Sequence, residues 1–170
     1  MAPLYTGVGG FGRFAAMTPS HPGRYAKEFL AGWGTMDFNG HMSNTSYLDV
    51  AADVRVAFWA DHGFPPGELR RLGIGPVIRK DELEYFREVG LYETVTVTHV
   101  VMAMSVDGAR WVVENEIWRA DGQRAARVRS TGGWLDLAAR KLVPPPAALL
   151  EVLEKAPRAP DFIELPKKSS

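Results

Sequence analysis

Residues 44–62 read NTSYLDVAADVRVAFWADH, a long run in which apolar side chains recur with a helical period. The apolar residues form two neighbouring stripes: Tyr47, Ala51, Val54 and Phe58, and Leu48, Ala52 and Trp59. Asp49 and Asp53 leave only a narrow polar strip, so other elements must cover most of this helix. His62-Gly63 predicts its end, because glycine is favoured just past the last helical turn.

Four strand patterns follow this helix, at residues 76–88, 92–106, 109–119 and 124–136. Asp-Gly pairs at 107–108 and 121–122 separate the last three strands at the short spacing typical of β-hairpins. A further strand is predicted before the helix, at residues 24–36. One strand, one long helix and four antiparallel strands form an α+β order, and a five-stranded sheet wrapped around the helix would bury it.

These elements predict one domain at residues 24–143, preceded by a flexible arm at residues 1–23. The arm contains Gly7-Val8-Gly9-Gly10-Phe11-Gly12, which formally matches a dinucleotide-binding glycine pattern. That pattern requires a buried strand before it and a helix after it, and the arm offers neither. We therefore predict no nucleotide cofactor, and no other cofactor.

Two segments outside the regular pattern complete the prediction. Residues 64–75 read as a loop with a helical turn around Leu69. The C-terminal segment, residues 144–170, begins with three prolines that end the sheet, and continues with a short helix at 147–155. Residues 156–170 are predicted to be a mobile tail.

Charge and cysteine content exclude several classes of function. The chain has 170 residues, 20 acidic and 20 basic side chains, so no strong field indicates a nucleic-acid or membrane partner. The absence of cysteine excludes a disulfide framework, a cysteine metal site and a cysteine nucleophile. The four histidines lack metal-ligand spacing, and no metal is predicted. No run approaches about 18 apolar residues and no leader pattern is present, so a cytoplasmic location is expected.

The stretch Asp37-Phe38-Asn39-Gly40-His41-Met42-Ser43-Asn44 lies directly before the helix and concentrates reactive groups. A carboxylate can act as a nucleophile or general base, and an imidazole can move protons near neutral pH. A helix that begins here directs its unpaired backbone N–H groups towards the same place. These features together favour an acyl-transfer site.

This stretch resembles the signature of hot-dog-fold thioesterases, of both the 4-hydroxybenzoyl-CoA type and the plant acyl-ACP type. The acyl-ACP pattern reads Asp-x-Asn-x-His-x-x-Asn-x-x-Tyr, and Asp37, Asn39, His41, Asn44 and Tyr47 fill its positions. The resemblance extends over residues 24–140 and implies a hot-dog fold, with the sheet wrapped around the central helix.

Residues 83–89, LEYFREV, are similar to a second segment of the same enzymes, Leu-Glu-Tyr-Arg-Arg-Glu-Cys. Phe86 replaces an arginine here and Val89 replaces the cysteine, which rules out a cysteine-dependent mechanism and leaves an aspartate mechanism intact. Glu88 is a candidate catalytic residue by this resemblance. A solvated charge at the end of a strand is the alternative for Glu88.

The resemblance implies a catalytic aspartate at Asp37, which attacks the thioester directly or through a water molecule. The alternative for Asp37 is an Asx-turn aspartate before Asn-Gly. Asn39 is a candidate to orient the carboxylate or to donate to the thioester carbonyl, or else a turn former. His41 is a candidate to activate water or hold Asp37 in place, with a half-buried structural histidine as the alternative.

Substrate contacts are predicted from the residues around the turn. The backbone N–H groups of Gly40 to Met42, and of the first helical turn, are candidate oxyanion donors. Asn44 is a candidate substrate-binding residue. Its structural alternative is to cap the N-terminus of the helix, a position that either Ser43 or Asn44 could fill. Trp33, Phe38 and Trp59 are candidates to line an acyl tunnel, or else to form part of the core.

Arg127 and Arg129 are predicted to share one face of a strand, with Val128 on the other. They are candidates to contact the phosphates of CoA or an acidic carrier protein. The alternative is a solvated sheet face.

The sequence thus predicts a hydrolase of acyl-CoA or acyl-ACP thioesters. A non-catalytic acyl-thioester-binding module and a hydratase of the same fold are the alternatives. A sheet of this kind leaves open edges, so a homodimer or homotetramer is expected.

Overall fold

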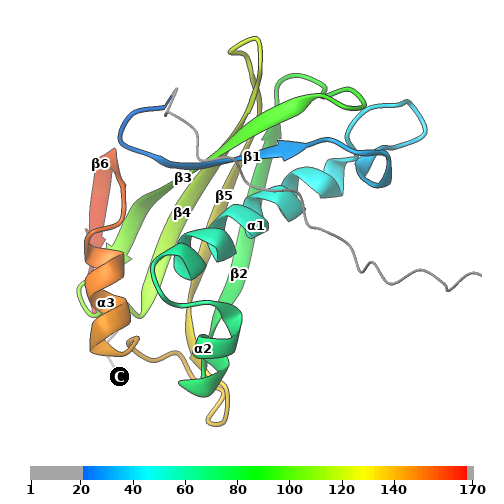
Figure 1. Ribbon diagram of the computed structural model, residues 1–170. Helices are drawn as coiled ribbons and strands as arrows, with labels where there is room; N and C mark the ends of the chain where they lie inside the picture. The colour runs from blue at the N-terminus through cyan, green and yellow to red at the C-terminus, as the bar shows by residue number, and fades with distance from the viewer. Residues whose placement is uncertain (1–20, 168–170) are drawn as a thin grey trace, which may run out of the picture.

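The computed structural model describes residues 21–167, in which an antiparallel sheet curls around one long helix (Figure 1). The helix, α1 (Asn44–Asp61), lies across one face of the sheet. The main strand order is β1-β3-β4-β5-β2. These strands are β1 (Tyr25–Leu30), β2 (Ile74–Tyr85), β3 (Thr94–Ser105), β4 (Arg110–Arg119) and β5 (Arg124–Asp136). The predicted sheet wrapped around a central helix is confirmed.

Both predicted hairpins are present. Gly108 N–H donates to the carbonyl of Ser105 at 2.7 Å, and Gly122 N–H donates to that of Arg119 at 3.0 Å. Each glycine adopts a positive φ, 69° and 80° respectively, which side chains disfavour. The Asp-Gly pairs therefore fix the register of β3, β4 and β5 as expected from sequence.

The first strand is shorter than predicted. β1 ends at Leu30, which pairs with Thr94, the first residue of β3. The chain then has no further strand to pair with and forms a short 3-10 helix, Trp33–Thr35. The predicted strand at residues 24–36 is therefore wrong beyond Leu30.

The prediction of a mobile tail is also wrong for most of its length. After α3 (Ala147–Glu154), residues Arg158–Leu165 form β6, which pairs in parallel with the second half of β3. β1 covers only the first half of that edge of β3, so its remaining N–H and C=O groups are free to accept β6. The sheet consequently has six strands rather than five, with β6 beside β3 in Figure 1.

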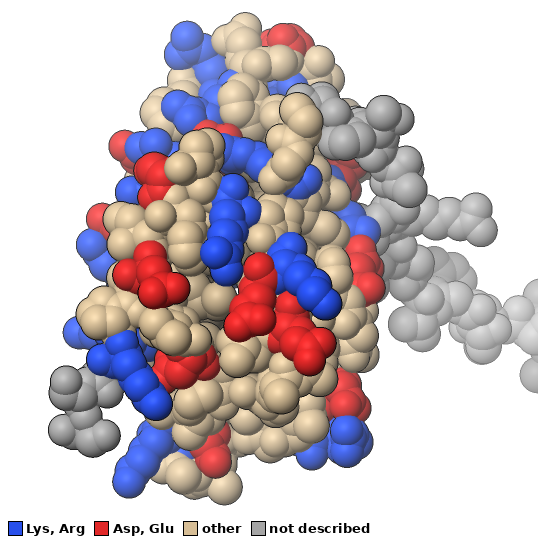
Figure 2. All heavy atoms as spheres, turned by 90° about the vertical axis from the view of Figure 1, so that its left-hand side faces the viewer, with Lys and Arg blue, Asp and Glu red and all other residues tan. Residues whose placement is uncertain are grey.

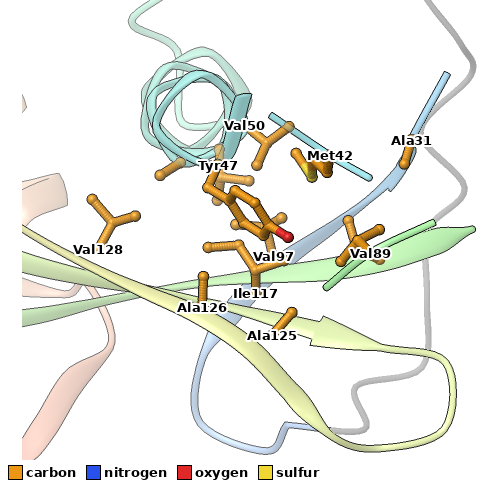
Figure 3. Close-up of a cluster of buried hydrophobic side chains, with 13 residues drawn as sticks. Ala31, Met42, Tyr47, Val50, Val89, Val97, Ile117, Ala125, Ala126 and Val128 are labelled. Carbon is orange, nitrogen blue, oxygen red and sulfur yellow. The ribbon is translucent and has the colours of Figure 1, made fainter. Parts of the chain in front are cut away.

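The core lies between α1 and the sheet and has two parts. In the first, Tyr47 extends from α1 towards the sheet among small and branched side chains such as Val97 and Ile117 (Figure 3). In the second, Trp59 packs on Trp134 of β5, with ring centroids 5.2 Å apart. The predicted polar strip is observed, because the residues at positions 49 and 53 are exposed. The predicted helical turn near Leu69 is α2 (Pro66–Arg71).

Charges are mixed rather than segregated on the face that Figure 2 displays, where basic and acidic side chains are interspersed. This agrees with the zero net charge of the sequence. Among residues 21–167, no helix is long and apolar enough to cross a membrane.

Candidate active site

Asp37 lies at the start of a tight turn between β1 and α1. Its backbone N–H donates to the carbonyl of His41 at 2.8 Å, and Gly40, at φ 79°, donates back to the carbonyl of Asp37 at 3.1 Å. The carboxylate oxygen Oδ1 accepts from the N–H groups of Asn39, at 2.8 Å, and His41, at 3.3 Å. The Asx-turn alternative is thus observed. It occupies only Oδ1, and no group in the described part of the chain donates to Oδ2.

Asp37 lines an open cleft of about 460 Å³ beside the N-terminus of α1. Glu88 supplies a second carboxylate to the cleft, and Arg87 and Arg119 supply two cations. Asn44, the first residue of α1, also lines it. The cleft therefore brings together the predicted residues Asp37, Glu88 and Asn44. The side chains of Asn39, which is exposed, and of His41, which is half-buried, are outside its lining.

Two tyrosines form the inner wall of the cleft. The rings of Tyr47 and Tyr85 meet edge to face, 5.4 Å apart, and the hydroxyl of Tyr85 donates to the carbonyl of Asn44 at 3.1 Å. Burial raises the pKa of the Tyr47 hydroxyl. Tyr47 and Met42, each only 4% exposed, line the cleft and also belong to the first part of the core (Figure 3), so they form the wall between the two.

The candidate oxyanion donors differ in availability. The N–H groups of Gly40 and His41 bond within the turn, and that of Met42 donates to the carbonyl of Val89 at 2.8 Å. All three are therefore occupied, contrary to their predicted availability. Ser43 is the helix N-cap and makes no side-chain capping bond. The next N–H groups, those of the first two helical residues, have no acceptor within the helix and remain as donors.

The two arginines of the cleft were not among the predicted site residues. Arg119 donates to the carbonyl of Glu88 at 3.0 Å and pairs with Glu93 at 3.4 Å, so it fixes the loop that carries Glu88. Arg87 is exposed and donates to Gln123 at 3.1 Å. Arg119 lies at the end of β4 without a recognisable motif, whereas Arg87 lies within the segment 83–89, next to the predicted Glu88.

Arg127 and Arg129 lie elsewhere. They occupy the face of β5 opposite α1, with Val128 fully buried on the inner face, as the strand period predicts. Arg127 pairs with Glu84, and Arg129 pairs with Glu114 at 2.9 Å. They line a separate hollow together with Glu82 and Glu84. Their contact with substrate stays a prediction, and their ion pairs support the solvated-face alternative.

The three aromatic residues predicted for an acyl tunnel are not brought together. Trp33 and Phe38 are 77% and 97% exposed, whereas Trp59 is buried against Trp134. Trp59 follows Tyr47 by three helical turns and so lies about 18 Å further along α1. Trp59 therefore has the core role that was its alternative.

Comparison with known proteins gives a consistent result. A family model described as the thioesterase-like superfamily matches residues 31–153. A hypothetical protein from Staphylococcus aureus, solved in complex with CoA, superimposes with a TM-score of 0.73 at 18% identity, covering 80% of this chain and 86% of that one. A 1,4-dihydroxy-2-naphthoyl-CoA thioesterase from Synechocystis superimposes with a TM-score of 0.69 at 14% identity, covering 76% of this chain and 95% of that one. A gentisyl-coenzyme A thioesterase superimposes with a TM-score of 0.65 at 17% identity, covering 74% of this chain and 98% of that one. No curated protein sequence matches significantly.

Proposed function

This chain belongs to the thioesterase-like superfamily, and we propose that it hydrolyses acyl thioesters in the cleft beside Asp37. One observation carries the proposal: a carboxylate with an unoccupied oxygen shares a cleft with the open N-terminus of α1. A base or nucleophile next to backbone donors is what thioester cleavage requires. Release of free thiol from an acyl thioester is the reaction that tests it.

In the proposed mechanism, Oδ2 of Asp37 attacks the thioester carbonyl, or removes a proton from a water molecule that attacks it. The N–H groups of Asn44 and Thr45, aided by the helix dipole, stabilise the charge on the carbonyl oxygen. The C–S bond then breaks and the sulfur leaves as thiolate, which a thiol pKa of about 8.5 permits without a strong acid. Direct attack leaves a mixed anhydride, which water hydrolyses to the free acid.

We propose a positioning role for the two neighbouring residues of the turn. Asn39 and His41 donate their backbone N–H groups to Oδ1 of Asp37, which holds the carboxylate in one orientation. We propose that His41 acts through its backbone in this turn rather than through its imidazole, and that Glu88 lies beside the attacking water.

CoA is the carrier we favour over an acyl carrier protein. The solved structures that resemble this chain include a complex with CoA and enzymes named for CoA thioesters, and the cleft offers the cations of Arg87 and Arg119. Arg87 is the more exposed, and no carboxylate among the described residues pairs with it. It is therefore free to meet a phosphate of the nucleotide.

We expect Arg87→Ala to raise KM for an acyl-CoA about tenfold, the worth of one charge-assisted hydrogen bond. KM for the matching short pantetheine thioester, which lacks the nucleotide, should not change. The double variant Arg127→Ala, Arg129→Ala is the matched comparison, and we expect a smaller effect because Glu84 and Glu114 already pair with these side chains. A KM increase confined to the double variant would assign the phosphate contact to β5 instead.

We expect the protein to form at least a dimer in solution, joined along β2. The twelve residues of β2 form one edge of the sheet, and Ile78, Tyr85 and Phe86 are apolar side chains partly exposed on or next to it. A second copy pairing there would satisfy the edge and cover the cleft. Sedimentation at micromolar concentration should show the dimer, whereas a species of 18.8 kDa alone would contradict it.

A further inference from the structure

Beside the cleft, three elements change from apolar to polar side chains at the same level. The paired inward residues of β2 and β5 run from Tyr85 and Ala126, through Leu83 and Val128, to Asp81 and Ser130. Along the adjoining flank of α1, Leu48 is followed two turns later by Arg55. Leu48 and Leu83 are both half-buried against the first core cluster. Half-buried apolar side chains thus lie between the cleft and a set of polar groups from three elements.

Those polar groups form one connected cluster, the Arg55–Asp81 cluster. Arg55 is only 4% exposed, and its Nη1 donates to Oγ of Ser130 at 2.9 Å and to Oδ1 of Asn115 at 3.3 Å. Ser130 in turn donates to Oδ1 of Asp81 at 2.5 Å. Nearby His99 is fully buried, which lowers its pKa to about 3 and keeps it neutral. Arg55 is thus a buried cation whose direct partners are both neutral.

A buried charge of this kind is costly unless it is fully hydrogen-bonded. Arg55 offers five N–H donors, and its two hydrogen bonds both leave from Nη1. Asp81 is half-exposed on the edge strand, and its bond to Ser130 uses only one of its oxygens. The cluster therefore keeps capacity both to donate and to accept a hydrogen bond.

The distance from the cleft to the cluster is similar along α1 and along β2. Arg55 follows Tyr47 by eight helical residues, about 12 Å. Asp81 precedes Tyr85 by four strand residues, about 13 Å. Because Tyr47 and Met42 form the wall between the cleft and the core, the apolar surface nearest to an acyl group in the cleft is this edge, beside Leu48 and Leu83.

We propose that the acyl group lies between α1 and β2, and that Arg55 and Asp81 bind a hydroxyl group at its far end. This inference rests on the proposed function and adds a substrate class: medium-length acyl thioesters with a distal hydroxyl. A hydroxyl accepts from Arg55 and donates to Asp81 at once. A terminal methyl group would meet neither the remaining N–H donors of Arg55 nor the second oxygen of Asp81.

The test compares ω-hydroxydecanoyl-CoA with decanoyl-CoA. We expect the parent to prefer the hydroxylated substrate about tenfold or more in kcat/KM, because a site built for a hydroxyl rejects the analogue that lacks it. Arg55→Met and Asp81→Asn should each bring that ratio close to one. Glu82→Gln is the matched control, since Glu82 neighbours Asp81 but pairs with Lys80 on the opposite face, and it should keep the parent ratio. The ratio is independent of how much of a variant is folded.

The proposal would be overturned if the parent showed no preference for the hydroxylated substrate, or if Arg55→Met and Asp81→Asn both kept that preference. The cluster would then serve only to stabilise the packing of α1 on the sheet. If those variants do not fold, calorimetry on the parent with the free acids decides: ω-hydroxydecanoate should bind more tightly than decanoate, and equal affinity would contradict the inference. Failure of the proposed function has a different signature, the absence of thiol release from every acyl-CoA.

Discussion

The Asp37→Asn variant is expected to lose between about 10²-fold and 10⁴-fold in kcat/KM for thioester hydrolysis, the range typical of a general base. A nucleophilic role would give a larger loss. Asparagine keeps an oxygen that accepts from Asn39 and His41, so the turn is preserved, but it neither attacks the carbonyl nor takes a proton. Thiol release measures the rate, and an unchanged unfolding midpoint shows that the fold is retained.

Asp136→Asn is the matched control for this substitution. Asp136 also accepts two backbone N–H groups, those of Ala138 and Ala139, through Oδ1 in a turn. Its replacement should leave the rate unchanged, since it is not among the residues that line the cleft. His41→Ala should cost less than Asp37→Asn, because the proposed role of His41 uses its backbone. If kcat/KM of the Asp37→Asn variant were within a few-fold of the parent value, Asp37 would have only a structural role in the turn.

Gly132→Ala is expected to have the largest effect on stability, a loss of about 3 kcal/mol in the free energy of unfolding. A Cβ at this position would lie 2.4 Å from the carbonyl oxygen of Val77 and 2.6 Å from the ring of Trp111. Val77 is on β2, paired with β5, so its oxygen moves only if the ladder between the two strands is distorted. Urea unfolding of the parent and the variant measures the difference.

Gly67→Ala provides the control for the glycine substitution. Gly67 lies in α2 and a Cβ there would meet nothing within 4 Å. Alanine should therefore be neutral or stabilise the protein by up to about 1 kcal/mol, since it favours the helix. If Gly132→Ala and Gly67→Ala had similar stabilities, the close packing of β5 against β2 would be refuted.

The sequence predicted correctly those elements whose formation depends on residues close together in the chain. The period of α1 and the two Asp-Gly turns depend on neighbouring residues, and their positions agree with the structure. β6 was missed because its formation depends on an edge of β3 that lies more than fifty residues away in the chain. The end of β1 at Leu30 was missed for the same reason, since it is set by where β3 begins.

The site was predictable in part. The short stretch around Asp37 predicted the turn and the helix N-terminus that follows it. The structure places Asp37, Asn44 and Glu88 in one cleft. Arg119 lies on β4, outside both motifs, so no local spacing indicated it, whereas Tyr85 lies within the second segment, residues 83–89. Trp59 shares a stripe with residues near the cleft, but the length of α1 carries it to the other end of the core.

The central claim, that this cleft hydrolyses acyl thioesters, is tested most directly by incubating the protein with a panel of acyl-CoAs that includes an enoyl-CoA. Free thiol, free acid and double-bond absorbance are followed together. We predict that thiol and acid appear in equal amounts, while the double bond of the enoyl group is unchanged. Binding without thiol release would instead identify an acyl-thioester-binding module, and loss of double-bond absorbance without thiol would identify a hydratase. Either result would contradict the assignment of a thioesterase.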